Sequence, residues 1–377
     1  MAGIYIHIPF CRQACNYCNF HFSVSLKNKK VLINALVNEI ETESNFITDK
    51  HIETIYIGGG TPSLLNENEL EIIFRALQKK YSIKKDAEVT LEANPDDVNE
   101  ATLAMWKRNG INRLSVGLQS FNEADLKWMN RAHNANQSVK CLDDIVYAGF
   151  TNFSVDLIYG SPVQTNEDLK NNINIITSRN IPHISCYALT VEPNTLLNKN
   201  IKEKKSATVS SEKQAEQFYL LKQMLYNAGY EQYEISSFCK PGKRSKHNSS
   251  YWQGKPYFGF GPSAHSFNGF DKRRWNISNN SFYIQSLEKN IIPYEEEVLT
   301  AVQRINEYVM TALRTYEGIN MKHVVEHFGE QHKKDLIAAA QKIIISGKLI
   351  LQHENLKLTD EGMFFADGIA GDLFFEI

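Results

Sequence analysis

The first half of the chain alternates short apolar or β-branched runs with longer amphipathic stretches, and this alternation constrains the fold more than any other feature. Strands joined through helices pair in parallel, because a right-handed crossover returns each strand to the side of the one before it. The pattern predicts an α/β fold, a partial (β/α)6 barrel with the carboxyl ends of its strands gathered at one rim. Strands are predicted at Ile4–Ile8, Thr54–Ile57, Glu88–Glu92, Arg113–Gly117, Phe153–Ile158 and His183–Leu189. Helices, with apolar residues three and four apart, are predicted at Val31–Glu43, Glu69–Lys80, Glu100–Arg108 and Asp168–Thr177.

The second half changes character. A long helix, Glu212–Asn227, precedes an extra strand at Gln232–Ile235, and the aromatic- and glycine-rich residues 251–270 are predicted to be loop and short irregular structure. Three helical patterns and a two-stranded hairpin then predict a small winged-helix-like α+β module; they lie at Ala301–Arg314, Met321–Phe328, Lys333–Ser346, Lys348–Gln352 and Leu356–Leu358. We expect a barrel over residues 1–240, a connecting segment over 241–295 and the C-terminal module over 296–377.

Charge and cysteine content limit the partners and the compartment. The formal net charge of −2 gives no electrostatic reason to expect nucleic acid, and Glu326, Glu330 and Asp335 offset the lysines of the C-terminal module. Six cysteines in 377 residues do not make a disulfide framework. No signal peptide precedes Tyr5, and no apolar run reaches about 18 residues. A cytoplasmic protein with at most transient membrane contact is expected.

Cys11, Cys15 and Cys18 follow the first predicted strand with the spacing CxxxCxxC and no fourth cysteine nearby. A cubane 4Fe-4S cluster held by three thiolates keeps one iron free for a small chelating ligand, as in radical S-adenosylmethionine (SAM) chemistry. Structural zinc is the alternative, but it needs four ligands, and the nearest candidates are His7 and His21. A ferredoxin cluster would need four cysteines. The spacing therefore favours the open cluster.

Polar residues stand where the predicted strands end. Gly58–Pro62 can bring backbone groups close to a ligand, because glycine carries no side chain. Glu92, Gln119 and Asp156 each follow or interrupt an apolar run, and Arg131 comes a little later. A carboxylate suits the ribose or ammonium of SAM, and an arginine suits its carboxylate. Each residue alone is more typical of a cap or ion pair; together at one rim they indicate a shared ligand.

From Tyr5 to Ser266 the chain resembles the oxygen-independent coproporphyrinogen III oxidase family of radical SAM proteins. The motifs that carry the resemblance are 5–11, the cysteine triplet, 58–63, 114–121, 156–162 and 185–195. The resemblance implies that Cys11, Cys15 and Cys18 hold the 4Fe-4S cluster. It also implies a SAM site made of Tyr5, Gly59, Gly60, Thr61, Glu92, Gln119, Arg131, Asp156, Ala188 and His265.

Within this family the chain is similar to the members that act as heme chaperones, through 358–362, 371–374 and the motif HNxxYW at 247–252. The oxidases continue their triplet as CxxxCxxCxC, whereas Phe20 stands here, and they carry an N-terminal lid where only four residues precede Tyr5. The resemblance implies a chaperone that binds heme, with His247 as a candidate axial ligand, and transfers it to acceptor hemoproteins.

Alternatives remain open at this stage. One is an enzyme that decarboxylates coproporphyrinogen III, with SAM cleaved by one electron from the cluster, and the other is a winged-helix regulator with an oxygen-sensing cluster. The alternative role for His247 is a hydrogen bond to a loop, and the rival heme ligands are His21, His133, His265, Cys186 and Cys239. The apolar tail 373–375 allows a homodimer.

Overall fold

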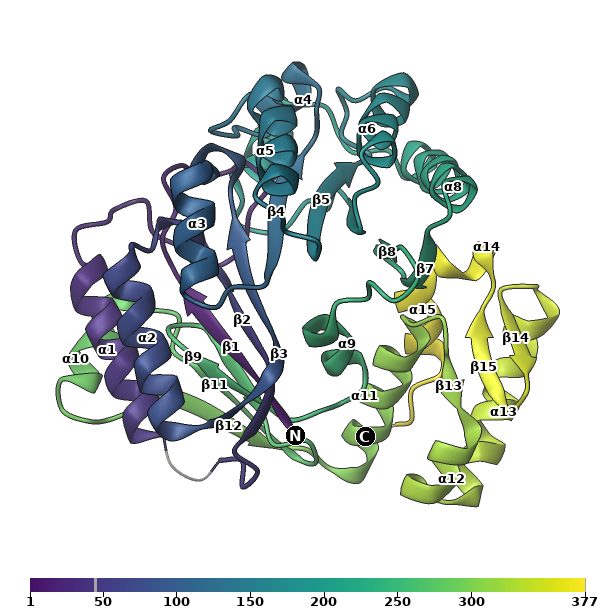
Figure 1. The fold of residues 1–377 in the computed structure, drawn as a ribbon. Coiled ribbons are helices and arrows are strands. Elements are labelled where there is room, and N and C mark those ends of the chain that lie inside the picture. The colour runs from purple at the N-terminus through teal and green to yellow at the C-terminus, as the bar shows by residue number, and fades with distance from the viewer. Residues whose placement is uncertain (44–45, 377) are drawn as a thin grey trace.

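The computed structural model describes residues 1–43 and 46–376. Within them a twelve-stranded sheet curves around one side of the molecule, and a three-stranded sheet belongs to the C-terminal module (Figure 1). The strand order of the large sheet is β12-β11-β10-β9-β1-β2-β3-β4-β5-β6-β8-β7. Its central strands are β1 (Ala2–Ile8), β2 (His51–Gly59), β3 (Ser82–Ala93), β4 (Arg113–Gln119), β5 (Phe153–Tyr159) and β6 (His183–Ala188).

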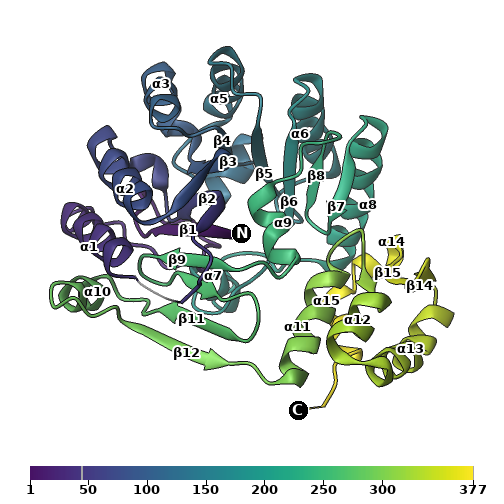
Figure 2. The ribbon, with the colours of Figure 1, turned by 60° about the horizontal axis from the view of Figure 1, so that its bottom comes forward.

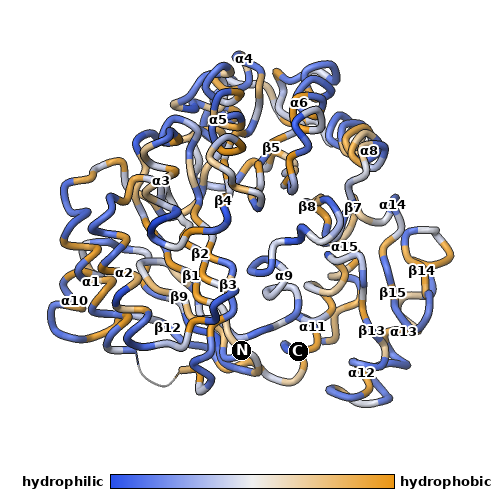
Figure 3. The backbone as a smooth tube through the Cα atoms, viewed as in Figure 1, coloured by the Kyte–Doolittle hydropathy of each residue, from blue (hydrophilic) through white to orange (hydrophobic). Residues whose placement is uncertain are grey.

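These six strands pair in parallel with their sequence neighbours, so the predicted partial barrel is confirmed. The helices between them form an arc outside the sheet (Figure 2). They are α1 (Lys29–Thr42), α2 (Glu67–Lys80), α3 (Glu100–Arg108), α4 (Glu123–Trp128), α5 (Ala135–Tyr147) and α6 (Asn166–Ser178), followed by α7 (Leu196–Lys202) and α8 (Ser211–Asn227). The hydropathy colouring places apolar residues mainly on the strands and on the helix faces turned to them (Figure 3).

Local sequence explains where two of these helices begin. Asn66 and Glu69 form a reciprocal capping box at the start of α2, and Thr165 and Asp168 form another at α6. Each box satisfies backbone N–H groups that the first helical turn leaves without partners. Both helices are therefore fixed in position directly after a strand, with the strand's carboxyl end left free for the site.

The predicted extra strand exists as β7 (Glu231–Glu234), but it does not pair with β6. A second short strand, β8 (Ser237–Cys239), lies between them, and both pairings are antiparallel. The chain turns back directly after β7, so β8 takes the place beside β6. The pattern of a four-residue strand does not show which strand it will pair with. The edge of the barrel therefore ends in an antiparallel ribbon.

The prediction of loop and short irregular structure for residues 251–270 is wrong, because the segment contains paired strands. This part contains the end of α9 (Lys246–Trp252), then β9 (Tyr257–Phe260) and β10 (His265–Phe267). β9 pairs in parallel with β1, and Phe258 and Phe260 are fully buried there. A Cβ at Gly259 would overlap the carbonyl of His265, so the glycine permits the tight hairpin. Three further elements extend this edge: β11 (Lys272–Asn276), α10 (Asn280–Leu287) and β12 (Tyr294–Val298).

The C-terminal module has its own hydrophobic core and the winged-helix order of elements, as predicted. The elements are α11 (Ala301–Leu313), β13 (Ile319–Asn320), α12 (Met321–Phe328), α13 (Glu330–Ile345), β14 (Leu349–Gln352) and β15 (Asn355–Leu358). Two helices absent from the prediction follow, α14 (Asp360–Met363) and α15 (Ala366–Asp372). The apolar tail 373–375 packs mainly within its own module, because Leu373 is buried in this core and Phe375 packs against it. No helix within 1–43 or 46–376 has the length and apolarity needed to cross a membrane.

Candidate functional site

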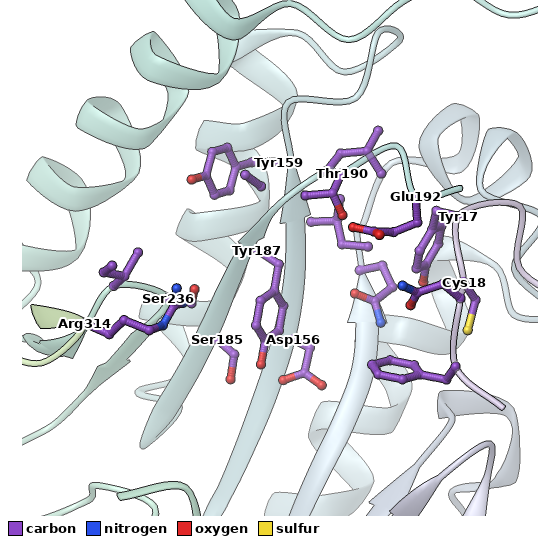
Figure 4. A pocket seen from close by; sticks show the side chains of 18 of the residues that line it. Tyr17, Cys18, Asp156, Tyr159, Ser185, Tyr187, Thr190, Glu192, Ser236 and Arg314 are labelled. Atoms are coloured by element: carbon purple, nitrogen blue, oxygen red, sulfur yellow. The ribbon is translucent and has the colours of Figure 1, made fainter. Parts of the chain in front are cut away.

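A cavity of about 1230 Å³ lies at the carboxyl ends of the parallel strands, and the C-terminal module lines its other side. Figure 4 shows Asp156, Ser185 and Tyr187 near its centre, with Tyr17 and Cys18 on one side and Arg314 on the other. The structure brings together at this cavity most residues that the sequence predicts for a cluster and SAM site. They are Cys11, Cys15, Cys18, Gly59, Gly60, Thr61, Glu92, Gln119, Arg131, Asp156 and Ala188.

The three cysteines are free thiols on the loop that leaves β1. Backbone bonds fix this loop, since Cys11 N donates to Ser23 O at 3.0 Å and Cys18 N donates to Cys15 O at 3.3 Å. Burial raises the pKa of Cys11, against the hydrogen bond of the Thr61 hydroxyl, and raises that of Cys18 to about 11. Both thiols hold their protons at neutral pH without a metal, so metal binding would release protons.

The donor set of this loop is three free thiols, with no fourth cysteine close to them in the sequence. A cubane cluster uses each thiolate on a different iron, so three thiolates fit such a cluster and leave one iron without a side-chain ligand. A tetrahedral zinc ion would need a fourth ligand.

Gly59 and Gly60 bring β2 close to the start of the cysteine loop. Gly59 has φ +113°, a backbone conformation that disfavours other residues, and a Cβ there would lie 2.8 Å from the His7 ring. A Cβ at Gly60 would lie 2.7 Å from the carbonyl oxygen of Phe10, and Gly60 N donates to Ile8 O at 2.9 Å. Gly59 is required by its positive φ and by the His7 ring, and Gly60 is required by the close approach of the Phe10 backbone. Both glycines line the cavity.

Arg131 connects three pieces of the rim. Its Nη1 donates to the Cys15 sulfur at 3.2 Å, and its Nη2 donates to Asn94 Oδ1 at 2.9 Å and to Gly117 O at 2.7 Å. Its Nε is buried with no partner among the described residues. The guanidinium thus holds the cysteine loop against the ends of β3 and β4 and keeps one donor for a ligand.

Two carboxyls line the cavity, Glu92 from β3 and Asp156 from β5, with β4 between their strands. Glu92 accepts hydrogen bonds from the Tyr56 hydroxyl at 2.7 Å and from Gly59 N at 3.1 Å. Burial raises the pKa of Glu92 to about 7 and that of Asp156 to about 6. Removal from water disfavours the charged form of each carboxyl. A cationic ligand would restore both to the ionised form.

Gln119 is strained at the end of β4. Its φ is +68°, unusual for a residue with a side chain, and the pairing of β4 with β5 shifts register between Gly117 and Gln119. Its Oε1 is buried without a partner in the described chain. A strained residue with an unsatisfied polar atom facing a cavity is typical of a ligand site.

Three predicted residues do not line the cavity. The hydroxyl of Tyr5 lies 3.1 Å from His7 Nδ1, and His265 stacks on Trp275 at 6.0 Å. His247 is buried, with Nδ1 2.8 Å from the Thr54 hydroxyl and Nε2 2.8 Å from the Tyr251 hydroxyl. Burial lowers the pKa of His247 to about 3. Both ring nitrogens of His247 are engaged inside the protein.

Several cavity residues escape the sequence reasoning. Asn94 sits between Thr61 and Arg131, and the pair Asn94-Pro95 at a strand end was the available signal. Asn248 belongs to HNxxYW and lines the cavity, although the motif's histidine does not. Arg314 and Lys342 reach the cavity from the C-terminal module, and no local pattern indicates that.

Comparison with known proteins agrees with this geometry. Residues 5–176 match the model of the radical SAM superfamily, and 299–365 match the HemN C-terminal domain. The chain is 32% identical over 381 residues to the heme chaperone HemW of Bacillus subtilis, covering 100% of both. It belongs to the HemW family. A HemW from Mycobacterium tuberculosis is 30% identical, with 98% of this chain and 94% of that protein covered. A HemW from Escherichia coli is 35% identical, with 70% of this chain and 69% of that protein covered.

The fold of this HemW family member also matches a solved structure. Coproporphyrinogen III oxidase (HemN) from Escherichia coli superposes with a TM-score of 0.85 at 21% identity, covering 100% of this chain and 90% of that one. At this identity the likeness establishes the fold alone. Membership of the radical SAM superfamily implies a 4Fe-4S cluster and SAM.

Proposed function

We propose that this protein is a heme chaperone that binds heme beside a SAM-ligated 4Fe-4S cluster and passes the heme to acceptor hemoproteins. The observation that carries the proposal is full-length similarity to proteins named heme chaperone HemW, in a chain whose cavity keeps all three cysteines. The free thiols fit a reducing compartment, and the cytoplasm is the expected one.

In this proposal Cys11, Cys15 and Cys18 hold the cluster, which supplies an electron and an open iron when bound. The chain's own groups orient SAM. Glu92 and Asp156, which line the cavity, would bind its positively charged groups and hydroxyls, and Arg131, whose Nε has no partner among the described residues, would bind its carboxylate. Gln119 offers a further acceptor, and the turn at Gly59 and Gly60 offers backbone.

Heme ligation by His247 stays a prediction, and the geometry makes it demanding. The imidazole would have to give up its bonds to Thr54 and Tyr251 and leave an interior where it is 1% exposed. The stacking of His247 on Tyr56, 5.1 Å between ring centres, links it instead to the residue that holds Glu92. This contact gives the histidine a positioning role for the rim.

Phe20 bears on the choice between chaperone and oxidase. It stands where the oxidases continue their cysteine pattern, and it is 68% exposed at the cavity. A large apolar side chain there suits contact with an apolar ligand or an acceptor protein. It offers no thiol for the pattern of the oxidases.

The test begins with anaerobic reconstitution of the full chain and analysis of iron and sulfide, with the variant Cys11→Ser, Cys15→Ser, Cys18→Ser as control. Hemin titration should then give a Soret shift at about one heme per chain, and the loaded protein should pass heme to an apo-hemoprotein. Stoichiometric zinc without inorganic sulfide would overturn the cluster. Conversion of coproporphyrinogen III to protoporphyrinogen IX with SAM and reductant would favour the oxidase instead.

A further inference from the structure

One part of the cavity is unused by the proposed SAM site. Ligand pockets commonly measure about 300–1,000 Å³, whereas this cavity measures about 1230 Å³. The additional lining comes from the C-terminal module and the β7–β8 hairpin, and Figure 4 places Ser236 and Arg314 on the side away from Cys18. The cavity therefore has room for a second ligand between the rim and the module.

Three cations of the C-terminal module line this part: Arg314, Lys342 and Lys348. Lys342 is exposed, and its ammonium takes part in no side-chain hydrogen bond or ion pair among the described residues. Lys348 lies 4.2 Å from the centre of the Phe365 ring rather than beside a carboxylate. Arg314 meets Asp367 at 3.3 Å, but the Asp367 side chain is 86% exposed, so that pair is weak.

The same part is otherwise largely apolar. Phe364, Phe365 and Ile369 line it from the module, and Ile235 lines it from the hairpin end. Asp367 and Asp372 are the module's only acidic residues among the described cavity lining. An apolar wall with three cations beside it suits a flat apolar ligand that carries carboxylates at its edge.

The HNxxYW segment reaches this part through two residues other than its histidine. Asn248 lines the cavity directly, and the Trp252 ring lies under Arg314 at 5.3 Å. Arg314 Nε and Trp252 Nε1 are both buried without partners among the described residues. Trp252 of the motif thus packs against the guanidinium of Arg314, while the Nε donor of Arg314 stays without a partner among the described residues.

We propose that Arg314, Lys342 and Lys348 bind the propionate carboxylates of a tetrapyrrole whose ring lies on Phe364, Phe365 and Ile369. This inference rests on the proposed function and names the part of the site that takes the heme. It assigns HNxxYW a positioning role, because Trp252 supports Arg314. The recognised group is the propionate, which heme and coproporphyrin share.

The test compares hemin with hemin dimethyl ester, which lacks the propionate charges, by Soret titration of the full chain. The variant is Arg314→Gln, Lys342→Gln, Lys348→Gln, and the control is Lys322→Gln, Lys334→Gln on exposed faces of the same module. We expect the variant to bind hemin about tenfold or more weakly, because it lacks the three cations that pair with the propionates; tenfold corresponds to about 1.4 kcal/mol of binding free energy. The ester should bind wild type and variant alike.

Equal hemin affinity in wild type and variant overturns the inference and leaves the chaperone proposal intact. No hemin binding by wild type overturns the proposed function itself. Far-ultraviolet circular dichroism separates loss of the site from loss of the fold, and Lys342→Gln, Lys348→Gln without the arginine change gives a milder variant. A titration with coproporphyrin III distinguishes the sources: tighter binding of that tetracarboxylate than of hemin indicates a biosynthetic porphyrin as the natural ligand and overturns heme as the occupant.

Discussion

At the scale of single residues, Gly60 shows how one missing side chain fixes the cluster loop. A Cβ at this position would meet the backbone nitrogen and oxygen of Phe10 at 2.8 and 2.7 Å, and neither atom can turn away as a side chain can. The loop that carries Cys11 begins one residue later. The position of the first thiol therefore depends on a glycine that directly follows another strand, β2.

We expect Gly60→Ala to lower the free energy of unfolding by about 1–3 kcal/mol, because inserted atoms force backbone shifts in a packed region. It should also reduce the iron retained after reconstitution. Urea denaturation and iron analysis measure the two effects. The control is Gly371→Ala in α15, where a Cβ meets nothing within 4 Å and the helix gains up to about 1 kcal/mol. Equal iron content and stability in Gly60→Ala and wild type would contradict this account.

Glu39 of α1 is a buried carboxyl outside the site. It accepts from Gly261 N at 2.8 Å, from Asn276 and from Tyr283, so it ties α1 to the β9–α10 edge. Burial raises its pKa from 4.5 to about 7. Over that interval the folded protein keeps a proton that the unfolded chain has lost, so stability falls as pH rises from about 4.5 to 7 and is level above it.

We expect Glu39→Gln to remove this slope, because an amide does not ionise. The free energy of unfolding of wild type minus that of the variant should decrease as pH rises through the interval. Urea titrations at pH 4.5, 5.5, 6.5 and 7.5 measure it. Parallel curves for the two proteins would show that Glu39 does not carry the raised pKa.

At the scale of elements, the local sequence pattern predicts those helices and strands whose formation does not depend on a neighbouring strand. The strands β1–β6 are recognisable because each is an apolar run buried on both faces, and Glu92 and Asp156 were recognisable as polar residues at their ends. β8 and β9 were not recognisable, because runs of three or four residues form strands only where they can pair with the edge of an existing sheet. The burial of His247 likewise depends on β2 and Tyr251, which its motif spacing does not encode.

The segment after α4 joins the cysteine loop to two strand ends through Arg131. A lysine cannot reproduce this, because one ammonium does not span the Cys15 sulfur, Asn94 and Gly117 O together. We expect Arg131→Lys to cost about 1–3 kcal/mol of stability and to lower iron and sulfide per chain. Denaturation and metal analysis measure both effects.

The matched control is Arg12→Lys. Arg12 pairs with Asp97 at 2.8 Å, yet its side chain is 58% exposed. That change should alter stability by less than about 1 kcal/mol. Should both lysine variants retain iron as wild type does, the three-way contact of Arg131 is not what holds the loop.

At the scale of the whole molecule, two hydrophobic cores meet across the cavity. The described links between them include Lys222 with Asp360, the Ile235 N to Arg314 O bond at 3.0 Å and the Tyr316 N to Tyr233 O bond at 3.0 Å. Met363 packs against both cores and Ile235 packs against that of the module, so the interface is partly polar and partly apolar. Relative motion of two such parts is the usual expectation unless their interface is large and hydrophobic. This docking is also why the module's share of the cavity was not predictable from the sequence, whereas its winged-helix pattern was.

A ligand that touches both sides should therefore lock them together. We expect hemin to slow amide hydrogen exchange in residues 363–372 of the module and in 185–192 at the end of β6, since both line the cavity. Binding at 100 times Kd stabilises the closed form by about 2.7 kcal/mol, which is measurable by exchange. β11 and β12, outside the cavity, serve as the internal reference. Slowing confined to 185–192 would mean that the ligand sits on the barrel alone, because a module that opens freely would exchange at its usual rate.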